Sequence, residues 1–205
     1  MGKFESRVIL DGSNQKVIDL EKNKSEFIEI LGCVRRQGIE SLLESLLEEG
    51  DFFKAPASSR YHGAFPGGLC AHSIAVYHQL KNLAELYAPG VYSEESLAIV
   101  SLFHDLCKVN VYKTEMRNVK KDGQWVQLPF YKFEEDFAFG GHGEKSVFLV
   151  MEHMALTREE AVAINTHMGF AGAQNINAVS EAYDKNLLAW LLHVADEAAT
   201  YITKI

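Results

Sequence analysis

The sequence lacks any long apolar run and contains few cysteines. No stretch of about 18 apolar residues occurs, so we expect no membrane-spanning helix. The first residues, MGKFESRVIL, have no apolar core of the kind that a secretory signal needs. The cysteines Cys33, Cys70 and Cys107 are odd in number and share no CxxC spacing, which argues against a disulfide framework or a thiolate zinc site. We therefore expect a cytoplasmic protein with reduced, buried thiols.

Positive charge is also scarce. The chain has 20 Lys and Arg residues against 28 Asp and Glu residues, and its formal net charge is −8. Binding to nucleic acid depends on Lys and Arg side chains that displace counterions from phosphates, so this composition does not favour nucleic acid as a partner. A small phosphorylated substrate is compatible with it, because a bound metal ion can supply positive charge locally.

What the sequence does contain is helical periodicity. With 205 residues, 47% of them hydrophobic, the chain is long enough for one domain with a substantial core. In residues 1–24 a DGSN turn separates two short apolar stretches, so this segment is predicted as a small hairpin or an arm. Apolar residues then recur at helical spacing over 27–34 and 39–47, with Gly38 between them. Residues 25–205 are predicted to form a single helical domain.

The middle of the chain predicts two further helices. A loop rich in Pro, Gly and Ser precedes the first, which covers about 69–87. The second begins near Ser93, where a capping serine is followed by acidic residues. The pair His104-Asp105 is expected in the middle of this helix, with Lys108 one turn later on the same side.

The remaining segments predict an inserted hairpin followed by helices. Residues 110–133 are rich in β-branched and aromatic residues around an Asp-Gly turn, which predicts a β-hairpin inserted into the helical domain. A helix is then expected to run to about Met154, and Thr157 with Glu160 predicts a capping box for the next one. A last helix is predicted from about residue 180 or 184 to 202.

Six histidine and aspartate side chains form the most informative pattern in the sequence. Imidazole nitrogen and carboxylate oxygen are ligands for Zn, Mn, Fe, Co or Ni. An Asp beside a His in an apolar stretch needs a partner for its buried charge. We therefore expect these side chains to meet at a metal site on a helical scaffold. The six are His72, His104, Asp105, His142, His167 and Asp196.

Other histidines and cysteines have simpler interpretations. His78 and His153 are expected to be packed or surface residues, since His78 points away from the inner face of its helix. His193 lies three residues before Asp196 and is expected to support a ligand rather than to bind the metal. Cys70 and Cys107, although close to the proposed ligands, are expected to be small core residues.

The order H…HD…H…H…D, with HDLCK at residues 104–108, resembles the HD-domain superfamily of metal-dependent phosphohydrolases. The stretches PASSRYHGAFPGGLCAHS and LLHVADEA are similar to the branch that includes the HD domain of bacterial 3′–5′ exoribonucleases. This likeness runs from about Ala55 to Ala199, with the hairpin as an interruption. Two positions depart from the pattern: Cys107 stands where a glycine is common, and Met168 where the branch has a second histidine.

The resemblance implies an all-α HD-domain bundle with an inserted β-hairpin. It also implies an enzyme that hydrolyses a nucleotide or another small phosphate ester through metal-bound hydroxide. The cofactor would be one or two divalent ions of Mn, Ni, Zn, Fe or Mg. His72, His104, Asp105 and Asp196 would hold the first ion, and Asp105, His142 and His167 the second.

Three further residues are candidates for binding the substrate. Lys108 would face the same cavity as His104 and stabilise charge on the phosphate, which makes Lys108 and Asp105 the expected catalytic residues; the alternative for Lys108 is a salt bridge to a nearby acid. Arg60 and His62 lie in the loop before the His72 helix. They are candidates for phosphate binding and for protonation of the leaving group.

Several alternatives remain open at this point. Some members of the superfamily use the same ligand set as a di-iron centre that activates oxygen, and HDxxK does not separate the two chemistries. A non-enzymatic nucleotide-binding module is a third possibility. The hairpin mixes aromatic and basic residues and could carry a nucleic-acid strand. Its interspersed acidic residues favour a solvated ribbon or a dimer contact instead.

Overall fold

The structure is a computed structural model that describes residues 8–10, 16–121, 123–135, 139–171 and 175–205. The described chain is mostly helical, as predicted, and its strands form two separate antiparallel pairs. None of the described helices combines the length and the apolar composition needed to cross a bilayer. The elements are β1 (Val8–Leu10), β2 (Lys16–Ile18), α1 (Leu20–Leu31), α2 (Ile39–Glu48), α3 (Gly68–Tyr87), α4 (Glu94–Phe103), the 3₁₀ turn η1 (Leu106–Lys108), β3 (Tyr112–Lys121), β4 (Gln124–Phe133), α5 (His142–Met151), α6 (Arg158–Thr166), α7 (Ile176–Lys185), α8 (Leu187–Ala198) and the π-helical turn η2 (Ala199–Thr203).

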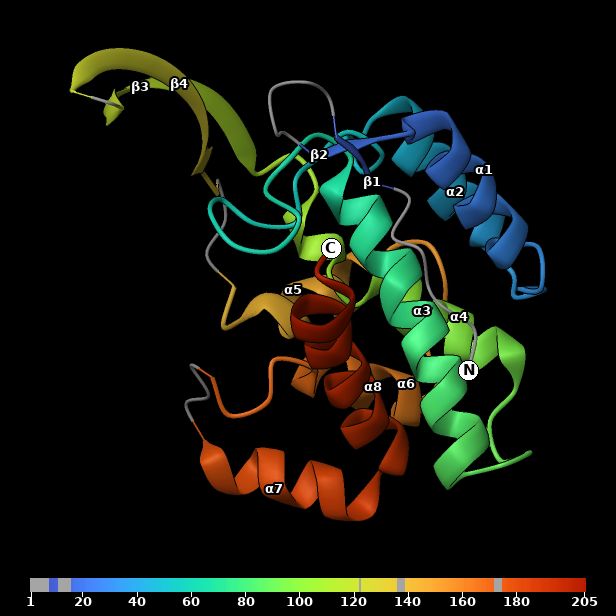
Figure 1. The fold of residues 1–205 in the computed structure, drawn as a ribbon. Coiled ribbons are helices and arrows are strands. Elements are labelled where there is room, and N and C mark those ends of the chain that lie inside the picture. Colours follow the sequence, from blue (N-terminus) through green and yellow to red (C-terminus); the bar gives the residue numbers. More distant parts are fainter. Residues whose placement is uncertain (1–7, 11–15, 122, 136–138, 172–174) are drawn as a thin grey trace.

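Helix α3 runs through the centre of the molecule, and α1, α4 and α8 pack around it (Figure 1). One apolar cluster contains the rings of Phe27, Phe52 and Phe103, with centroids 5.0 Å apart for Phe27–Phe52 and 6.1 Å for Phe27–Phe103. A second cluster lies between α3 and α8 and includes Leu80 and Leu188. Each such fully buried side chain contributes about 1.5–3 kcal/mol to folding. These two clusters fix α3 and α8, and with them His72 and Asp196.

The N-terminal segment contains a short strand pair followed by an early helix start. Val8–Leu10 pairs with Lys16–Ile18, within the segment predicted as a hairpin or an arm; its DGSN turn lies outside the described residues. Helix α1 begins at Leu20 instead of residue 25, because the Asp19 side chain caps it by accepting from the Lys22 N–H at 3.0 Å.

Helix α4 is shorter than the sequence suggests. It ends at Phe103, so the prediction that His104-Asp105 lies in the middle of a helix is wrong. The backbone of Asp105 (φ −105°, ψ 21°) leaves helical geometry and leads into η1. In a continuous α-helix, consecutive side chains point about 100° apart. Because the helix ends before His104 and Asp105, their side chains are not held to this angle, and both can face the same point.

The C-terminal region forms two helices, so the prediction of one helix that starts at about residue 180 is wrong, while the alternative start at about 184 lies near the observed start of α8 at Leu187. Asn186 has an extended backbone, accepts from the Ala189 N–H through its side chain and donates to the Glu159 carbonyl at 2.9 Å. These bonds end α7 and begin α8. The chain then widens into η2, which directly follows the Asp196 turn of α8.

The predicted hairpin is present as β3 and β4, and it projects from the helical body (Figure 1). Tyr112 pairs with Phe133 at its base and Lys121 with Gln124 near its tip. Of the predicted Asp-Gly turn, Gly123 is described between the two strands, and Asp122 lies outside the described residues. The base of the hairpin adjoins the helical body, where Tyr112 and Phe133 line a cavity.

An ion pair with a buried carboxylate joins the loop between α1 and α2 to α4 and α6. The capping box of α6 is confirmed: Thr157 accepts from the Glu160 N–H, and Glu160 accepts from the Thr157 N–H. The Glu160 carboxylate, 1% exposed, also accepts two bonds from Arg36 at 2.5 and 3.0 Å and one from Ser96 at 2.8 Å. Burial raises the pKa of Glu160, but these donors outweigh it and hold the pKa below its ordinary value.

We predict that Glu160→Gln lowers the free energy of unfolding by about 2–3 kcal/mol at pH 7, since Arg36 then loses a buried counter-charge. A carboxyl whose pKa is lowered by folding stabilises the protein above its ordinary pKa, and this contribution is lost as the pH falls through the folded value. The difference between the two proteins should therefore shrink towards pH 3. Urea denaturation at pH 7 and pH 3 measures both effects. Glu159→Gln, on the exposed side of the same helical turn, should change stability by less than about 0.5 kcal/mol.

Candidate metal centre

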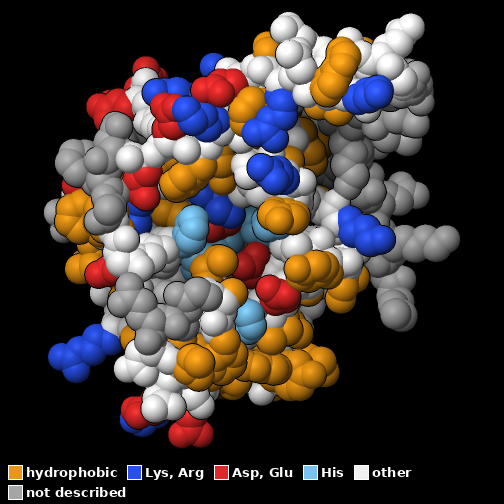
Figure 2. Space-filling view, turned by 90° about the vertical axis from the view of Figure 1, so that its left-hand side faces the viewer, with side chains coloured by type: hydrophobic (Ala, Val, Ile, Leu, Met, Phe, Trp, Pro, Cys, Tyr) orange, Lys and Arg blue, Asp and Glu red, His pale blue; other side chains and the backbone are white. Residues whose placement is uncertain are grey.

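A cavity of about 960 Å³ opens on the face seen in Figure 2. Its lining comes from the loop before α3, the end of α4, the base of the hairpin, the start of α5 and the end of α8. Histidine, acidic and basic side chains lie deep in this hollow, and hydrophobic side chains surround it (Figure 2). A cavity of this size suits a small-molecule ligand.

Asp105 lines the cavity, and its neighbour His104 is buried next to it. The ring of His104 is fully buried, and its Nδ1 lies 2.8 Å from the Ser101 carbonyl one turn earlier. This contact identifies Nδ1 as the protonated nitrogen and leaves the Nε2 lone pair free. Asp105 is 2% exposed, and its Oδ2 lies 3.4 Å from His104 Nε2. Both side chains therefore present ligand atoms to the same point.

His167 repeats the arrangement of His104 at the end of a different helix. It follows the last residue of α6, and its Nδ1 lies 2.7 Å from the Ile164 carbonyl. Its Nε2 is directed towards Asp105 Oδ1 at 3.5 Å. A backbone carbonyl thus fixes the tautomer of both histidines, which is how metal-binding imidazoles are commonly oriented.

His72 and Asp196 face this pair from α3 and α8. His72 is fully buried, and its Nε2 lies 3.0 Å from Asp196 Oδ1 and 3.7 Å from Asp105 Oδ2. Two groups with metal-ligand spacing result, each with its ligand atoms within 4.8 Å of one another. His72, His104 and Asp196 form the first group; His104, Asp105 and His167 form the second.

The donor atoms in these groups lack hydrogen-bond partners. Among the buried side-chain atoms of the described residues without a partner are the Nε2 atoms of His72, His104 and His167, and Asp105 Oδ1. Leaving one buried polar atom unsatisfied costs about 1–3 kcal/mol. These four atoms are distributed over the two ligand groups and fit one or two divalent cations, which would satisfy them. These buried His and Asp groups could therefore hold a metal ion.

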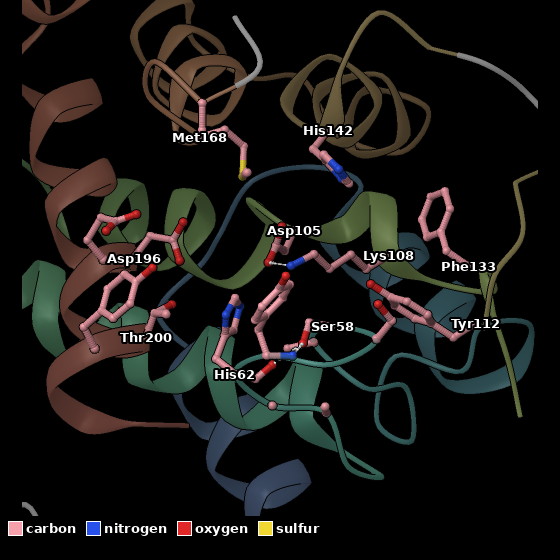
Figure 3. Close-up of a pocket in the computed structure, with 18 of the residues that line it drawn as sticks. Ser58, His62, Asp105, Lys108, Tyr112, Phe133, His142, Met168, Asp196 and Thr200 are labelled. Atoms are coloured by element: carbon pink, nitrogen blue, oxygen red, sulfur yellow. Dashed lines mark hydrogen bonds and ion pairs between the residues drawn. The ribbon is translucent and has the colours of Figure 1, made fainter. Parts of the chain in front are cut away.

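Lys108 provides a positive charge beside the centre. Its ammonium group lies 2.6 Å from Asp105 Oδ2, as the dashed line in Figure 3 marks. Burial alone would raise the pKa of Asp105, but Lys108 and His104 hold it well below its usual range. Burial likewise opposes the charge on Lys108, yet Asp105 raises its pKa. The pair is therefore ionised at neutral pH, with the cation at the cavity wall.

The structure does not bring His142 into either group. His142 begins α5 and is exposed, and its Nδ1 lies 3.4 Å from the Cys107 sulfur. It does line the cavity, with its ring on the opposite side of Asp105 from His62 (Figure 3). Its assignment to a second ion therefore stays a prediction.

The two loop candidates for substrate binding differ in position. His62 lines the cavity, and its ring lies 4.8 Å from that of His72. Burial, together with the neighbouring His72 and Lys108, lowers the pKa of His62 to about 4. At neutral pH the ring is therefore uncharged, and its role in protonating a leaving group stays a prediction. Arg60 is exposed and is not part of the lining, so its phosphate contact stays a prediction.

The histidines and cysteines expected to be uninvolved lie outside both groups. His78 contacts Glu26 at 2.9 Å, and His153 contacts Ser41 at 2.9 Å. His193 Nδ1 lies 2.8 Å from the His167 carbonyl, so it supports the backbone of a candidate ligand, as predicted. Cys70 and Cys107 are buried, and burial raises the pKa of each thiol to about 12.

Several lining residues were missed from the sequence. Tyr112 and Phe133 reach the cavity from the hairpin base, and Thr200 and Tyr201 reach it from η2. Thr200 follows Asp196 by four residues, a spacing that puts both on one side of a helix and could have identified it. Tyr112 and Phe133 carry no such signal, because the face of the hairpin on which each side chain lies depends on the residue at which its strand begins.

Comparison with known proteins adds no family assignment. The chain matches no protein-family model, no curated protein and no solved structure. The chemistry of the cavity is therefore the basis on which a function can be proposed.

We predict that Asp105→Ala abolishes metal binding while the helices remain folded. Asp105 faces both ligand groups, and loss of a direct ligand should weaken affinity by at least the roughly 10- to 100-fold that loss of an outer partner costs. Metal content measured by elemental analysis after dialysis tests this, with circular dichroism to monitor the helices. The matched control is Glu197→Gln, an exposed acid of the same cavity that belongs to neither group. Full metal content in Asp105→Ala would contradict the assignment.

Proposed function

We propose that this protein is an HD-domain phosphohydrolase that uses bound divalent metal to hydrolyse a nucleotide or another small phosphate ester. The observation that carries the proposal is the convergence of imidazole and carboxylate atoms from α3, α8 and the ends of α4 and α6 beside one buried lysine; those of His72, His104, His167 and Asp105 include atoms without a hydrogen-bond partner. Such a centre has ligands for a cation and a fixed positive charge for an anion. Phosphate esters are anions whose hydrolysis benefits from both.

The order of the ligands along the chain supports the same proposal. His72, the His104-Asp105 pair, His167 and Asp196 follow the sequence order of the HD superfamily. The first group and Asp105 account for every residue that the resemblance assigns to the first ion. The exposed position of His142 and the presence of Met168 leave the second ion less well provided for.

A divalent ion held by these residues would lower the pKa of a bound water and polarise a phosphoryl oxygen. The protein groups have separate tasks around it. Lys108 would bind a phosphate oxygen through its fixed charge, while Asp105 keeps the ammonium group in place. His62 would donate or accept a hydrogen bond as a neutral imidazole. The apolar rim would limit the access of water and strengthen these interactions.

We predict that the purified protein contains divalent metal and releases inorganic phosphate from a subset of nucleotides. Elemental analysis followed by a phosphate-release screen tests both parts. Iron that reaches a mixed-valence state, observed by electron paramagnetic resonance, would instead favour the oxygenase chemistry of the superfamily. Tight nucleotide binding without metal would favour a binding module.

Lys108→Met should reduce the rate of phosphate release by about a hundredfold, the effect of removing one group that stabilises transition-state charge. Metal content should be retained, because Lys108 is not a ligand. Lys145→Met is the matched control, since Lys145 is also largely buried and paired, with Glu135 at 2.6 Å, but lies outside the cavity lining. Equal losses in the two variants would count against a role for Lys108 in the reaction.

A further inference from the structure

The wall of the cavity next to Lys108 is aromatic and belongs to the hairpin. Tyr112 and Phe133 are paired in register at the hairpin base, and their ring centroids lie 5.8 Å apart at an interplanar angle of 72°. Both line the cavity. Figure 3 shows them on the Lys108 side, across from Asp196 and Thr200. The floor of the site thus carries charge, and this wall carries two rings.

The two faces of the hairpin differ sharply in chemistry. Side chains alternate along a strand, so the face that begins with Tyr112 and Phe133 continues with Thr114, Met116, Asn118 and Lys120 of β3 and with Trp125, Gln127 and Tyr131 of β4. This Tyr112 face has no acidic residue. The opposite face holds the ion pairs of Lys132 with Glu115 and of Lys113 with Glu134.

The Tyr112–Phe133 wall is suited to a ligand rather than to the protein core. Phe133 is 43% exposed, although large aromatic side chains gain most when they are covered. Tyr61 and Tyr201 also line the cavity but are 81% and 69% exposed, so a ring held there would stay largely in water. The hairpin wall lies on the same side of the cavity as the charge of Lys108 (Figure 3).

We infer that the Tyr112–Phe133 wall binds a planar, uncharged heteroaromatic ring carried by the phosphate ester, and so determines the specificity of the site. This inference rests on the proposed function, since Lys108 supplies the phosphate anchor. Aromatic side chains stack on bases through their faces without charge, which matches the absence of acids and of ion pairs on this surface. The inserted hairpin is thus the element that selects the organic part of the substrate.

Two phosphonates test the inference, because a carbon replaces the ester oxygen and neither can be hydrolysed. Adenosine 5′-phosphonate carries a ring, and ribose 5-phosphonate has the same anchor and sugar without one. Calorimetric titration of the metal-containing protein should give about tenfold tighter binding of the adenosine compound, the lower part of the range for a base stacked on an aromatic side chain. Equal affinity for both compounds would overturn the inference.

Variants identify the residue responsible. Phe133→Leu keeps apolar volume without a ring and should reduce the preference for adenosine several-fold, whereas Phe133→Tyr keeps a ring and should retain it. Trp125→Ala is the matched control, because Trp125 lies on the same face at the far end of the hairpin and is 71% exposed. Retention of the preference in Phe133→Leu, or its equal loss in Trp125→Ala, would refute the assignment to this wall.

A further titration distinguishes an error in the proposed phosphate site at Lys108 from an error in the ring-binding role of the Tyr112–Phe133 wall. If neither phosphonate binds, the same titration is repeated with adenosine, which has the ring but no phosphonate group. Binding of adenosine that depends on Phe133 would support the wall and overturn the proposed phosphate site. No binding of adenosine would overturn both.

Discussion

The buried negative charge of Asp105 is the constraint on which the site depends. A carboxylate that is 2% exposed is stable only where opposite charge surrounds it. Lys108 supplies part of that charge at 2.6 Å, but Asp105 Oδ1 and three imidazole nitrogens remain without partners. The protein therefore neutralises the negative charge of Asp105 only in part, and a bound cation could complete the neutralisation. Burying this charge opposes folding, and the apolar clusters around α3 stabilise the fold enough to offset that effect.

Some of the candidate ligands lie at the ends of helices, and others lie within them. His104 and His167 each follow the last residue of a helix, and each has its Nδ1 at the carbonyl three residues earlier. Both residues stand directly after the last helical residue, and the Nε2 atom of each is directed towards Asp105. His72 and Asp196, in contrast, are held within α3 and α8 by packing on both sides. The candidate site therefore combines two residues held within helices with two residues at helix ends.

Much of this arrangement could be predicted from the sequence, and the failures have physical causes. Capping residues such as Thr157 mark helix starts through local hydrogen bonds, so those boundaries were found. The helix end at Phe103 has no glycine or proline to mark it, because a tertiary environment selects the turn at Asp105. The break at Asn186 depends on a bond to the distant Glu159 carbonyl. The direction of His142 depends on contacts with Cys107 that no local pattern encodes.

The hairpin enters and leaves the helical body at one point, where the Glu134 N–H donates to the Val111 carbonyl at 2.7 Å. A segment closed at its base in this way can lengthen, shorten or change composition at little cost to the core, since each doubling of a loop costs only about 0.6 kcal/mol. The candidate metal ligands and the hairpin are therefore free to evolve at different rates. Related proteins could keep the buried His and Asp groups and exchange the ribbon beside them, in the way that antibodies keep a framework and vary their loops.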